Sequence, residues 1–473
     1  MSDERTPVVL LAGLAGAVLD EVAGAFLRLP GTAVVHHDLR EVAQGVVRRR
    51  VRWGAPTPAA SGPRADHGAA GPAARAGLPV DQWHVLELAH GCVSCTLRED
   101  LLPLTHRLSR TPGVDRIVLH LDPALEPEAL CWALRHVVVD GETVLERARV
   151  EAVVTVVDVG TWLADATGDE TLAERGLLAS ADDDRTVAQV CVGQVEFADV
   201  LVLAGAAPDA WAAERVAAVL DRLAPGAPRV PLARLDLAAL LARVPRDARR
   251  GELADAHAPL LRGQPPLDPD CGVSTVVFTE RRPFHPQRLH EAVDVLLDGV
   301  VRARGRVWVA SQPDVALWLE SAGGGLRVGH AGPWLAALEA AGGPDPWAGV
   351  DPQRRAMAAL RWDPYYGDRD QEVVVIAHHA DPGEIDAVLR HALLTDAELA
   401  EGEEAWRSWP DPFGEWHSDP CEDVDRDSDG DGDREGVGVD PGRDTAPWNT
   451  APTNTAAKKA DPRKTDPRKT EEK

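Results

Sequence analysis

Lysine and asparagine are almost missing from this sequence of 473 residues. The lysines all lie within the last 16 residues, from Lys458 to Lys473, and the asparagines are Asn449 and Asn454. Chemistry that needs a lysine amine or an asparagine amide is therefore excluded from the rest of the chain. Cysteine is also rare, at six residues. This number excludes a disulfide scaffold, and the thiols are expected to stay reduced.

Long apolar runs are absent as well. No stretch approaches the roughly 20 apolar residues of a membrane span. The run at residues 8–11 is too short for the core of a signal peptide, so we expect a cytoplasmic protein without a membrane partner. Acidic residues outnumber basic ones by 76 to 50, which gives a formal charge of −26. Because an acidic surface repels phosphate backbones, DNA is not expected as a partner.

Hydrophobic residues make up 44% of the chain, which is enough for a sizeable core, and the length suggests two or three domains. In the first half, short valine-rich runs alternate with helical patterns. Such runs are typical of buried parallel strands. The expected strands are residues 8–11, 33–35, 85–88, 116–121, 150–159 and 200–203. This alternation predicts an α/β fold with a parallel sheet covered by helices on both faces.

Composition and pattern divide the chain into four parts. Residues 1–245 form the parallel-sheet domain, interrupted by an Ala-, Pro- and Gly-rich loop or insertion at about 55–79. Residues 246–270 form a linker. Residues 271–416 form a smaller α+β domain, with strands expected at 274–279, 306–310 and 373–377. Residues 417–473 hold acidic clusters and little apolar content, which predicts a disordered acidic and polar tail.

The first strand–helix turn contains Gly13 and Gly16 and lies where a phosphate-binding loop would lie. Such a loop needs a lysine for the β- and γ-phosphates and a Ser or Thr for magnesium. Leu19 and Asp20 occupy these positions, and an aspartate repels phosphate. The turn is either a degenerate phosphate loop or an ordinary strand–turn–helix connection. Neither GTP nor magnesium is expected as a cofactor.

Cys92 and Cys95 form a C-x-x-C motif just before a predicted helix. Two thiolates at this spacing can hold one zinc ion, and a helix N-terminus lowers the pKa of a thiol. The pair supplies half of a tetrahedral site. His90 lies two residues earlier, and His36, His37 and His120 each end or follow a predicted strand at the edge where βα loops gather. These histidines are candidate ligands, and one or two of them could complete the coordination. The alternative is a pair of packed cysteines without metal.

The densest basic run is residues 48–52, which contain four arginines. It could contact phosphate, or it could be an exposed hairpin strand before the insertion. The sequence offers no interleaved aromatic residues of the kind that stack on bases.

These motifs resemble the CobW-like branch of P-loop GTPases and metallochaperones over residues 7–416. The most specific match is the C-x-x-C motif followed by a Leu-Arg-x-Asp-Leu pattern, here Leu97-Arg98-Glu99-Asp100-Leu101. Ser94 stands where the family has a third cysteine. In the second half, Arg282-Pro283-Phe284, Trp308 and Asp411-Pro412-Phe413 also fit. The resemblance implies a P-loop-type domain followed by a CobW-type C-terminal domain.

The nucleotide motifs of the family are replaced. Its guanine-reading Asn-Lys-x-Asp falls on Ala204-Gly205-Ala206-Ala207, and its strand-end Glu and following Gly fall on His120 and Pro123. With the altered phosphate loop, all three nucleotide elements are degenerate. The resemblance implies a GTPase, but these losses favour a pseudo-GTPase, and no catalytic or nucleotide-binding residue is assigned.

A narrower resemblance concerns residues 36–39, the run through residues 46–49 and the weak phosphate loop. These are similar to the actinobacterial ribosome hibernation factor-recruiting GTPases (Mrf). That resemblance implies an adaptor that brings a hibernation-promoting factor to 70S ribosomes under zinc limitation. The alternative implied by the wider family is a zinc metallochaperone that uses Cys92 and Cys95. A third hypothesis joins the two, with zinc at the cysteines switching the adaptor off.

Overall fold

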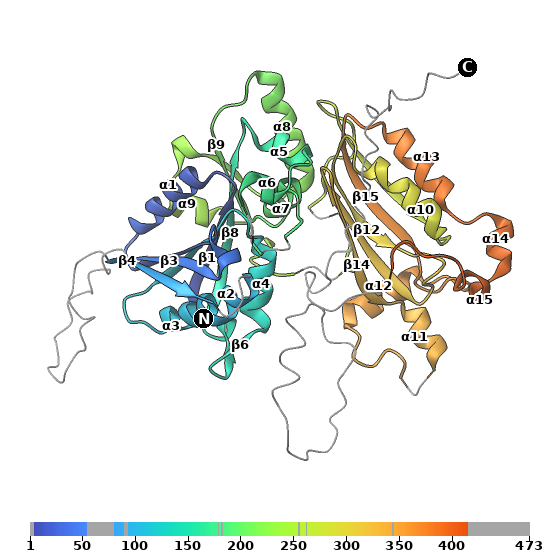
Figure 1. The fold of residues 1–473 in the computed structure, drawn as a ribbon, viewed down its shortest axis with the longest axis horizontal. Helices are drawn as coiled ribbons and strands as arrows, with labels where there is room; N and C mark the ends of the chain where they lie inside the picture. The colour runs from blue at the N-terminus through green and yellow to red at the C-terminus, as the bar shows by residue number, and fades with distance from the viewer. Residues whose placement is uncertain are drawn as a thin grey trace, which may run out of the picture.

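The computed structural model describes residues 4–53, 80–88, 93–177, 179–180, 183–253, 256–261, 263–342 and 345–414. The predicted insertion and tail lie outside these described residues, as do His90 and Cys92. Two large sheets, one in each half of the chain, organise the fold (Figure 1). The expected α/β architecture with a second, smaller α+β part is confirmed.

The first sheet has eight strands in the order β10-β9-β8-β1-β5-β2-β3-β4. Six of them, from β10 to β2, run parallel, and the apolar runs predicted five of these. β10 was not predicted, and the strand expected at residues 85–88 belongs to β4, which is antiparallel to its neighbour. β3 and β4 are antiparallel to their neighbours and form the hairpin at the edge. The strands are β1 (Thr6–Gly13), β2 (Thr32–Asp38), β3 (Val46–Trp53), β4 (Val80–Glu87), β5 (Arg116–His120), β8 (Ala148–Asp158), β9 (Val200–Ala204) and β10 (Arg229–Pro231).

Helices cover both faces of this sheet because alternate strand residues point to opposite sides. Val9, Val34 and Val118 pack with α1 (Gly16–Leu27) and α9 (Leu237–Ala242) on one face. Leu10, Val35 and Leu119 pack with α3 (Leu102–Ser109) and α4 (Pro127–His136) on the other. The remaining elements of this half are η1 (Val42–Gln44), α2 (Val93–Thr96), η2 (Leu97–Leu101), β6 (Val138–Val139), β7 (Glu142–Thr143), η3 (Val144–Glu146), α5 (Trp162–Thr167), α6 (Leu172–Arg175), α7 (Val187–Glu196), α8 (Ala210–Leu223) and η4 (Leu232–Arg234).

The second sheet has five antiparallel strands in the order β11-β15-β12-β13-β14. They are β11 (Val273–Glu280), β12 (Val300–Val307), β13 (Val315–Ala322), β14 (Gly325–Pro333) and β15 (Gln371–His378). One face packs against α10 (Pro286–Ala292) and α13 (Pro382–Ala392). The other elements are η5 (Val293–Leu296), α11 (Leu335–Ala341), α12 (Pro352–Arg361), α14 (Asp396–Glu401) and α15 (Glu403–Trp406). The β13–β14 hairpin was not predicted, and β12 begins six residues before the expected start at Arg306.

The opposite face of the second sheet meets the first half of the chain, and we call this contact the junction. Val301 and Ile376 of the sheet share one buried cluster with Val192 of α7 and Val219 of α8. Figure 1 shows α7 and α8 lying between the two sheets. The junction is therefore an apolar core of its own, which ties the two halves of the chain together.

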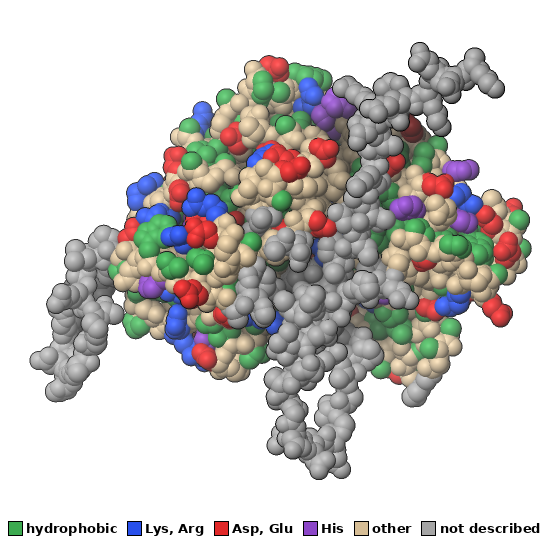
Figure 2. Space-filling model, viewed as in Figure 1, with side chains coloured by type: hydrophobic (Ala, Val, Ile, Leu, Met, Phe, Trp, Pro, Cys, Tyr) green, Lys and Arg blue, Asp and Glu red, His purple; other side chains and the backbone are tan. Residues whose placement is uncertain are grey.

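None of the helices in the described ranges is both long and apolar enough to cross a membrane. On the face seen in Figure 2, acidic and basic side chains of the described residues are interspersed.

Candidate functional site

The carboxyl edge of the first sheet, where its parallel strands end, carries the predicted phosphate loop. Gly13 ends β1 with φ +146°, a backbone conformation that favours glycine, and a Cβ there would lie 2.6 Å from the carbonyl oxygen of Val156. α1 begins at Gly16, so the glycine turn opens a helix as expected. Leu19, at the position of the lysine, is fully buried in the core between α1 and the sheet. It is a packing residue.

Asp20, at the position of the magnesium-binding hydroxyl, is 61% exposed and faces two cationic or basic groups. Its Oδ1 lies 3.9 Å from Nδ1 of His120 and 3.8 Å from a guanidinium nitrogen of Arg52. The first turns of α1 thus present a carboxylate where a nucleotide would place phosphate. The residues of this loop do not fit a magnesium–nucleotide complex.

His36 and His120 lie side by side at this edge, as the strand-end positions predicted. They are register partners on the parallel strands β2 and β5. Their rings stack with centroids 4.3 Å apart, and Nδ1 of His36 lies 3.0 Å from the carbonyl oxygen of His120. His120 is 4% exposed, and its Nδ1 is a buried atom with no hydrogen-bond partner among the described residues.

Burial is the main reason why the pKa of His120 falls to about 3, and the positive charge around it acts in the same direction. The ring is therefore neutral at physiological pH. A neutral imidazole nitrogen with a free lone pair is a metal ligand of the kind that zinc prefers.

His37 points to the opposite face of the sheet, because neighbouring strand residues alternate. Its Nε2 lies 2.7 Å from Oδ2 of Asp100, and Arg49 of β3 pairs with the same carboxylate. Asp100 belongs to η2, a π-helical turn between α2 and α3. Burial opposes the ionisation of Asp100, but its bonds to His37 and Arg49 lower its pKa overall. This contact ties β2 to the segment that follows the C-x-x-C motif.

Of the two cysteines, the described residues include Cys95 by its backbone, within α2, whereas Cys92 precedes the described segment. Val93, between them, donates its N–H to the carbonyl oxygen of Ala179 at 3.1 Å. Its side chain packs against a cluster that contains Ala124, just beyond the end of β5, and Leu14 of the phosphate loop packs on the same cluster. The start of α2 therefore lies at the carboxyl edge. His36 and His120 face α1, whereas His37 meets the segment after Cys95. The sequence offered His37 as one of the strand-end histidines, but it did not indicate Asp100 as its partner.

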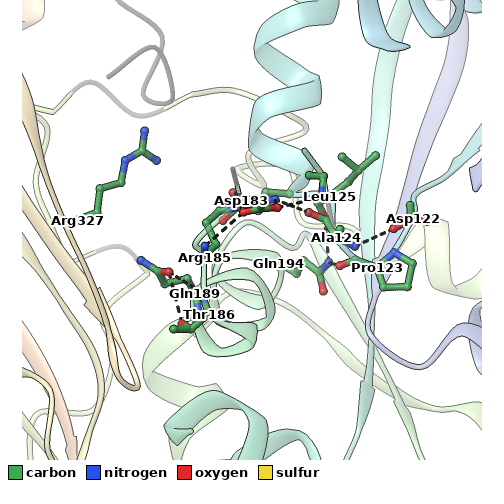
Figure 3. A network of polar contacts seen from close by, with 12 residues as sticks. Asp122, Pro123, Ala124, Leu125, Asp183, Arg185, Thr186, Gln189, Gln194 and Arg327 are labelled. Atoms are coloured by element: carbon green, nitrogen blue, oxygen red, sulfur yellow. Dashed lines mark hydrogen bonds and ion pairs between the residues drawn. The ribbon is translucent and has the colours of Figure 1, made fainter. Parts of the chain in front are cut away.

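The connection between β5 and α4 is fastened by side chains from α7 and the loop before it (Figure 3). Nε2 of Gln194 donates to the carbonyl oxygens of Pro123 at 3.1 Å and Leu125 at 2.9 Å. Arg185 donates to the carbonyl oxygen of Ala124 at 3.0 Å. Oδ1 of Asp122 accepts the N–H of Ala124 at 3.0 Å. The backbone of this connection is held in one conformation by several bonds.

At the place of the guanine-reading motif, the turn after β9 packs closely against the end of β8. Gly205 follows β9 with φ +68°, and a Cβ there would lie 2.4 Å from Oδ1 of Asp158 at the end of β8. Asp158 accepts the N–H of Gly160 at 2.9 Å. Asp158 is thus engaged by its own turn.

The arginine run forms β3, the predicted hairpin strand, and its side chains are paired. Arg48 pairs with Glu41 at 3.0 Å, Arg50 with Asp81 at 2.7 Å. The guanidinium group of Arg50 also lies 5.0 Å from the ring centre of Trp83, which is 56% exposed. The run is neutralised by acidic neighbours.

Comparison with known sequences gives the chain a family. Residues 73–231 match the nucleotide-binding domain of CobW/HypB/UreG proteins, and residues 273–393 match the C-terminal domain of the cobalamin synthesis protein CobW. The first match begins after the phosphate loop.

Two relatives are named for zinc. A zinc chaperone of Mycobacterium tuberculosis is 47% identical over 427 residues, which are 89% of this chain and 96% of the relative. The zinc-regulated GTPase metalloprotein activator 1 of Dictyostelium discoideum is 29% identical over 341 residues, 70% of each chain. The solved structure of the Zn(II)-bound YjiA GTPase from E. coli matches 83% of this chain and all of its own. Its TM-score of 0.34 and identity of 13% are too low to carry an argument.

Proposed function

The chain belongs to the CobW/HypB/UreG family and carries the CobW C-terminal domain, and from this premise we propose that it carries zinc as cargo for a client protein. The observation that carries the proposal is the His36–His120 pair at the carboxyl edge, where burial keeps His120 neutral and leaves its Nδ1 without a hydrogen-bond partner among the described residues. The names of the two zinc-related relatives support the same reading.

The ligands that we propose are the thiolates of Cys92 and Cys95 together with neutral histidines of this edge. The sequence offers His90, His36, His37 and His120. The structure supports His37, because a histidine that donates one ring N–H to a carboxylate keeps its other nitrogen as a lone-pair donor. Asp100 is that carboxylate for His37. The donor set of sulfur and nitrogen suits zinc better than magnesium or calcium.

We propose further that the protein handles zinc without a GTP cycle. Leu19 is buried where the phosphate-binding lysine is expected, and Asp20 offers a negative charge to a negatively charged ligand. The fastened β5–α4 connection also lacks the freedom that a nucleotide-driven switch requires. The expected result is no binding of a fluorescent GTP analogue at micromolar concentrations. Saturable, magnesium-dependent binding would reject this part of the proposal.

The zinc proposal is tested by competition against a chromophoric chelator with the purified full chain. The parent should bind one tight equivalent, and Cys92→Ser/Cys95→Ser should lose it. His36→Ala/His120→Ala and His37→Ala, measured side by side, identify which histidines take part. His391→Ala, at an exposed position on α13, is the control and should bind zinc as the parent does. A cysteine variant that retains the tight equivalent would exclude the motif.

The second candidate function is the adaptor that recruits a hibernation-promoting factor to 70S ribosomes. The observation that favours it is the same loss of the phosphate clamp at Leu19 and Asp20, because an adaptor needs no nucleotide cycle. Co-sedimentation with 70S ribosomes, with and without the factor and in chelated and zinc-supplemented buffer, tests it. Co-sedimentation that brings the factor along and fades with zinc would support the adaptor and a sensing role for the cysteines. Absence of association in every buffer would leave the metallochaperone.

A further inference from the structure

β4 is the outermost strand on one side of the first sheet (Figure 1), and among the described residues β3 is its only neighbour in the sheet. Leu88, just after β4, donates its N–H to the carbonyl oxygen of Gly45 at 2.8 Å. Because residues of an antiparallel pair alternately face the partner strand and face away from it, alternate residues of β4 present their backbone N–H and C=O groups away from β3. These residues are Asp81, Trp83, Val85 and Glu87, and we call their outward backbone groups the open side of β4. No backbone hydrogen bond within the described ranges engages the open side.

The side chains of the same four residues share one face of the sheet, and β4 is exposed along nearly its whole length. Two apolar side chains stand in the middle, Trp83 at 56% exposed and Val85 at 62%. β4 contains no proline, and its register with β3 shows no bulge. Natural proteins use both devices to protect exposed sheet edges. A strand with exposed apolar side chains and without these protections is suited to pair with a further strand.

The surface beside Trp83 and Val85 is hollowed, and this open hollow has a volume of about 650 Å³. The arginines and carboxylates that line it pair with each other: Arg40 with Asp38, and Arg48 with Glu41 at 3.0 Å. The hollow therefore offers room beside charges that are already paired, which suits an apolar side chain of a partner strand. When a strand adds to a sheet, backbone bonds supply affinity and such hollows accommodate alternate side chains.

Acidic residues flank the apolar pair on the same face of β4. Asp81 lies two residues before Trp83, Glu87 lies two residues after Val85, and both acidic side chains are exposed. Asp81 also pairs with Arg50 at 2.7 Å, whereas no ion pair within the described residues engages Glu87. In an added strand, basic residues are favoured opposite these carboxylates. The formal charge of −26 on the whole chain favours a basic partner in the same way.

A second copy of this chain fits β4 less well. Two identical strands related by a twofold axis run antiparallel. The register that pairs all four outward residues would set Asp81 opposite Glu87 at both ends, where like charges repel.

We propose that β4 binds an extended segment of a different protein as an antiparallel ninth strand of the first sheet. The segment has two apolar residues at alternate positions, opposite Trp83 and Val85, and a basic residue two positions outside each of them. The antiparallel direction is chosen because such pairs are slightly more stable per residue than parallel ones. The proposal does not rest on the proposed zinc function.

Fluorescence polarisation of the full chain with the labelled peptide Lys-Thr-Val-Thr-Val-Thr-Lys tests the proposal, and the peptide should bind saturably. Methylation of both valine backbone nitrogens should weaken binding about tenfold or more, because these N–H groups face β4. Methylation of two threonine nitrogens is the matched control and should weaken binding less, because those N–H groups face away. Replacing both lysines of the peptide by glutamate should weaken binding about fivefold or more.

Variants of the chain supply the matching test. Trp83→Ala should weaken peptide binding about tenfold. Trp211→Ala is its control and should bind as the parent does, because Trp211 on α8 is also 56% exposed and also lies beside an arginine. Val85→Pro removes one outward N–H and leaves the bonds to β3 in place, so it should weaken binding about tenfold or more. Glu87→Gln should weaken binding about twofold to fivefold.

Four results would each overturn the proposal: no saturable binding of the lysine peptide to the folded parent, equal effects of the two methylation patterns, equal affinities for the lysine and glutamate peptides, or unchanged binding in Trp83→Ala. If Val85→Pro failed to fold, the peptide methylated at its valines would measure the same backbone bonds. A dimer of the parent in sedimentation velocity that Val85→Pro dissociates would identify a second copy as the occupant, and the proposal would be wrong.

Discussion

At the carboxyl edge of the first sheet the buried polar groups include the histidines His37 and His120, whereas at the junction they include arginines and glutamates. His120 is kept neutral by burial. At the junction, Glu196 lies between Arg302 and Arg304, and Arg302 also pairs with Glu320 at 2.9 Å. Neutral imidazoles leave lone pairs for a ligand, while paired charges fix the orientation of the elements that carry them. The edge thus offers the lone pairs that the proposed zinc site needs, and the paired charges of the junction hold the two halves together.

The largest effect is expected at the junction, from Glu196→Gln. This change leaves two guanidinium groups buried without their shared carboxylate, and breaking a buried pair costs about 3–5 kcal/mol. Urea unfolding followed by tryptophan fluorescence measures the loss. Glu280→Gln, at a more exposed ion pair with Arg390, is the control and should leave the unfolding midpoint close to that of the parent. Equal midpoints for the two variants would show that the buried charges of the junction contribute no more to stability than an exposed ion pair.

A smaller loss is expected at the edge, from Asp100→Asn. The change removes the carboxylate that holds His37 and Arg49, and hydrogen bonds to a charged group are worth about 1.5–3 kcal/mol. Because the folded pKa of Asp100 is lowered, its stabilisation is complete above the unfolded pKa of roughly 3.9 and disappears as the pH falls through the folded pKa. The parent and the variant should therefore differ in urea midpoint at pH 7 and converge at acidic pH. Asp81→Asn, at an exposed pair, is the control.

Glu128 on α4 is predicted to make the stability of the junction depend on pH, because its carboxyl interacts with Glu320 and Glu196. Burial, joined by the carboxylates of Glu320 and Glu196, raises its pKa to about 7. Its folded pKa exceeds the unfolded one, so the parent should lose stability as the pH rises toward 7, by about 1 kcal/mol between pH 6 and 7. In Glu128→Gln this part of the pH dependence should be absent. An unchanged slope of unfolding free energy against pH would show that Glu128 ionises freely.

The smallest effect is expected where the edge meets solvent, from Arg48→Gln. Arg48 and Glu41 are each about half exposed, and such surface pairs contribute less than about 1 kcal/mol. Its neighbour Arg49 is 11% exposed and pairs with Asp100, so Arg49→Gln should lower the urea midpoint more. Equal urea midpoints for the two variants would show that the buried Arg49–Asp100 pair contributes no more to stability than the exposed Arg48–Glu41 pair.

Much of the first sheet could be predicted because buried parallel strands need apolar side chains on both faces. β12 was placed too late because Arg302, Arg304 and Arg306 interrupt its apolar pattern. Two of these arginines pair with Glu196, and the third with Glu372. No local pattern reveals partners that lie so far away along the chain. The β13–β14 hairpin was missed in the same part of the sequence.

The candidate site likewise holds one contact that the sequence predicted and one that it did not. The meeting of His36 with His120 followed from the rule that parallel strands end at one edge. The contact of His37 with Asp100 depends on how the π-helical turn η2 packs against β2, which spacing does not encode. The junction depends on the docking of two halves whose contacts are distant in sequence.

The sequence by itself determined that no lysine or asparagine is available to a nucleotide site before the last part of the chain, because no fold supplies a group that the chain lacks. It also determined the alternation of strands and helices that builds a parallel sheet. The tertiary structure alone decided that His120 is neutral, that Glu196 lies between two arginines and that β4 is the outermost strand of its sheet. Those properties arise from burial and proximity, which exist only once the chain is packed.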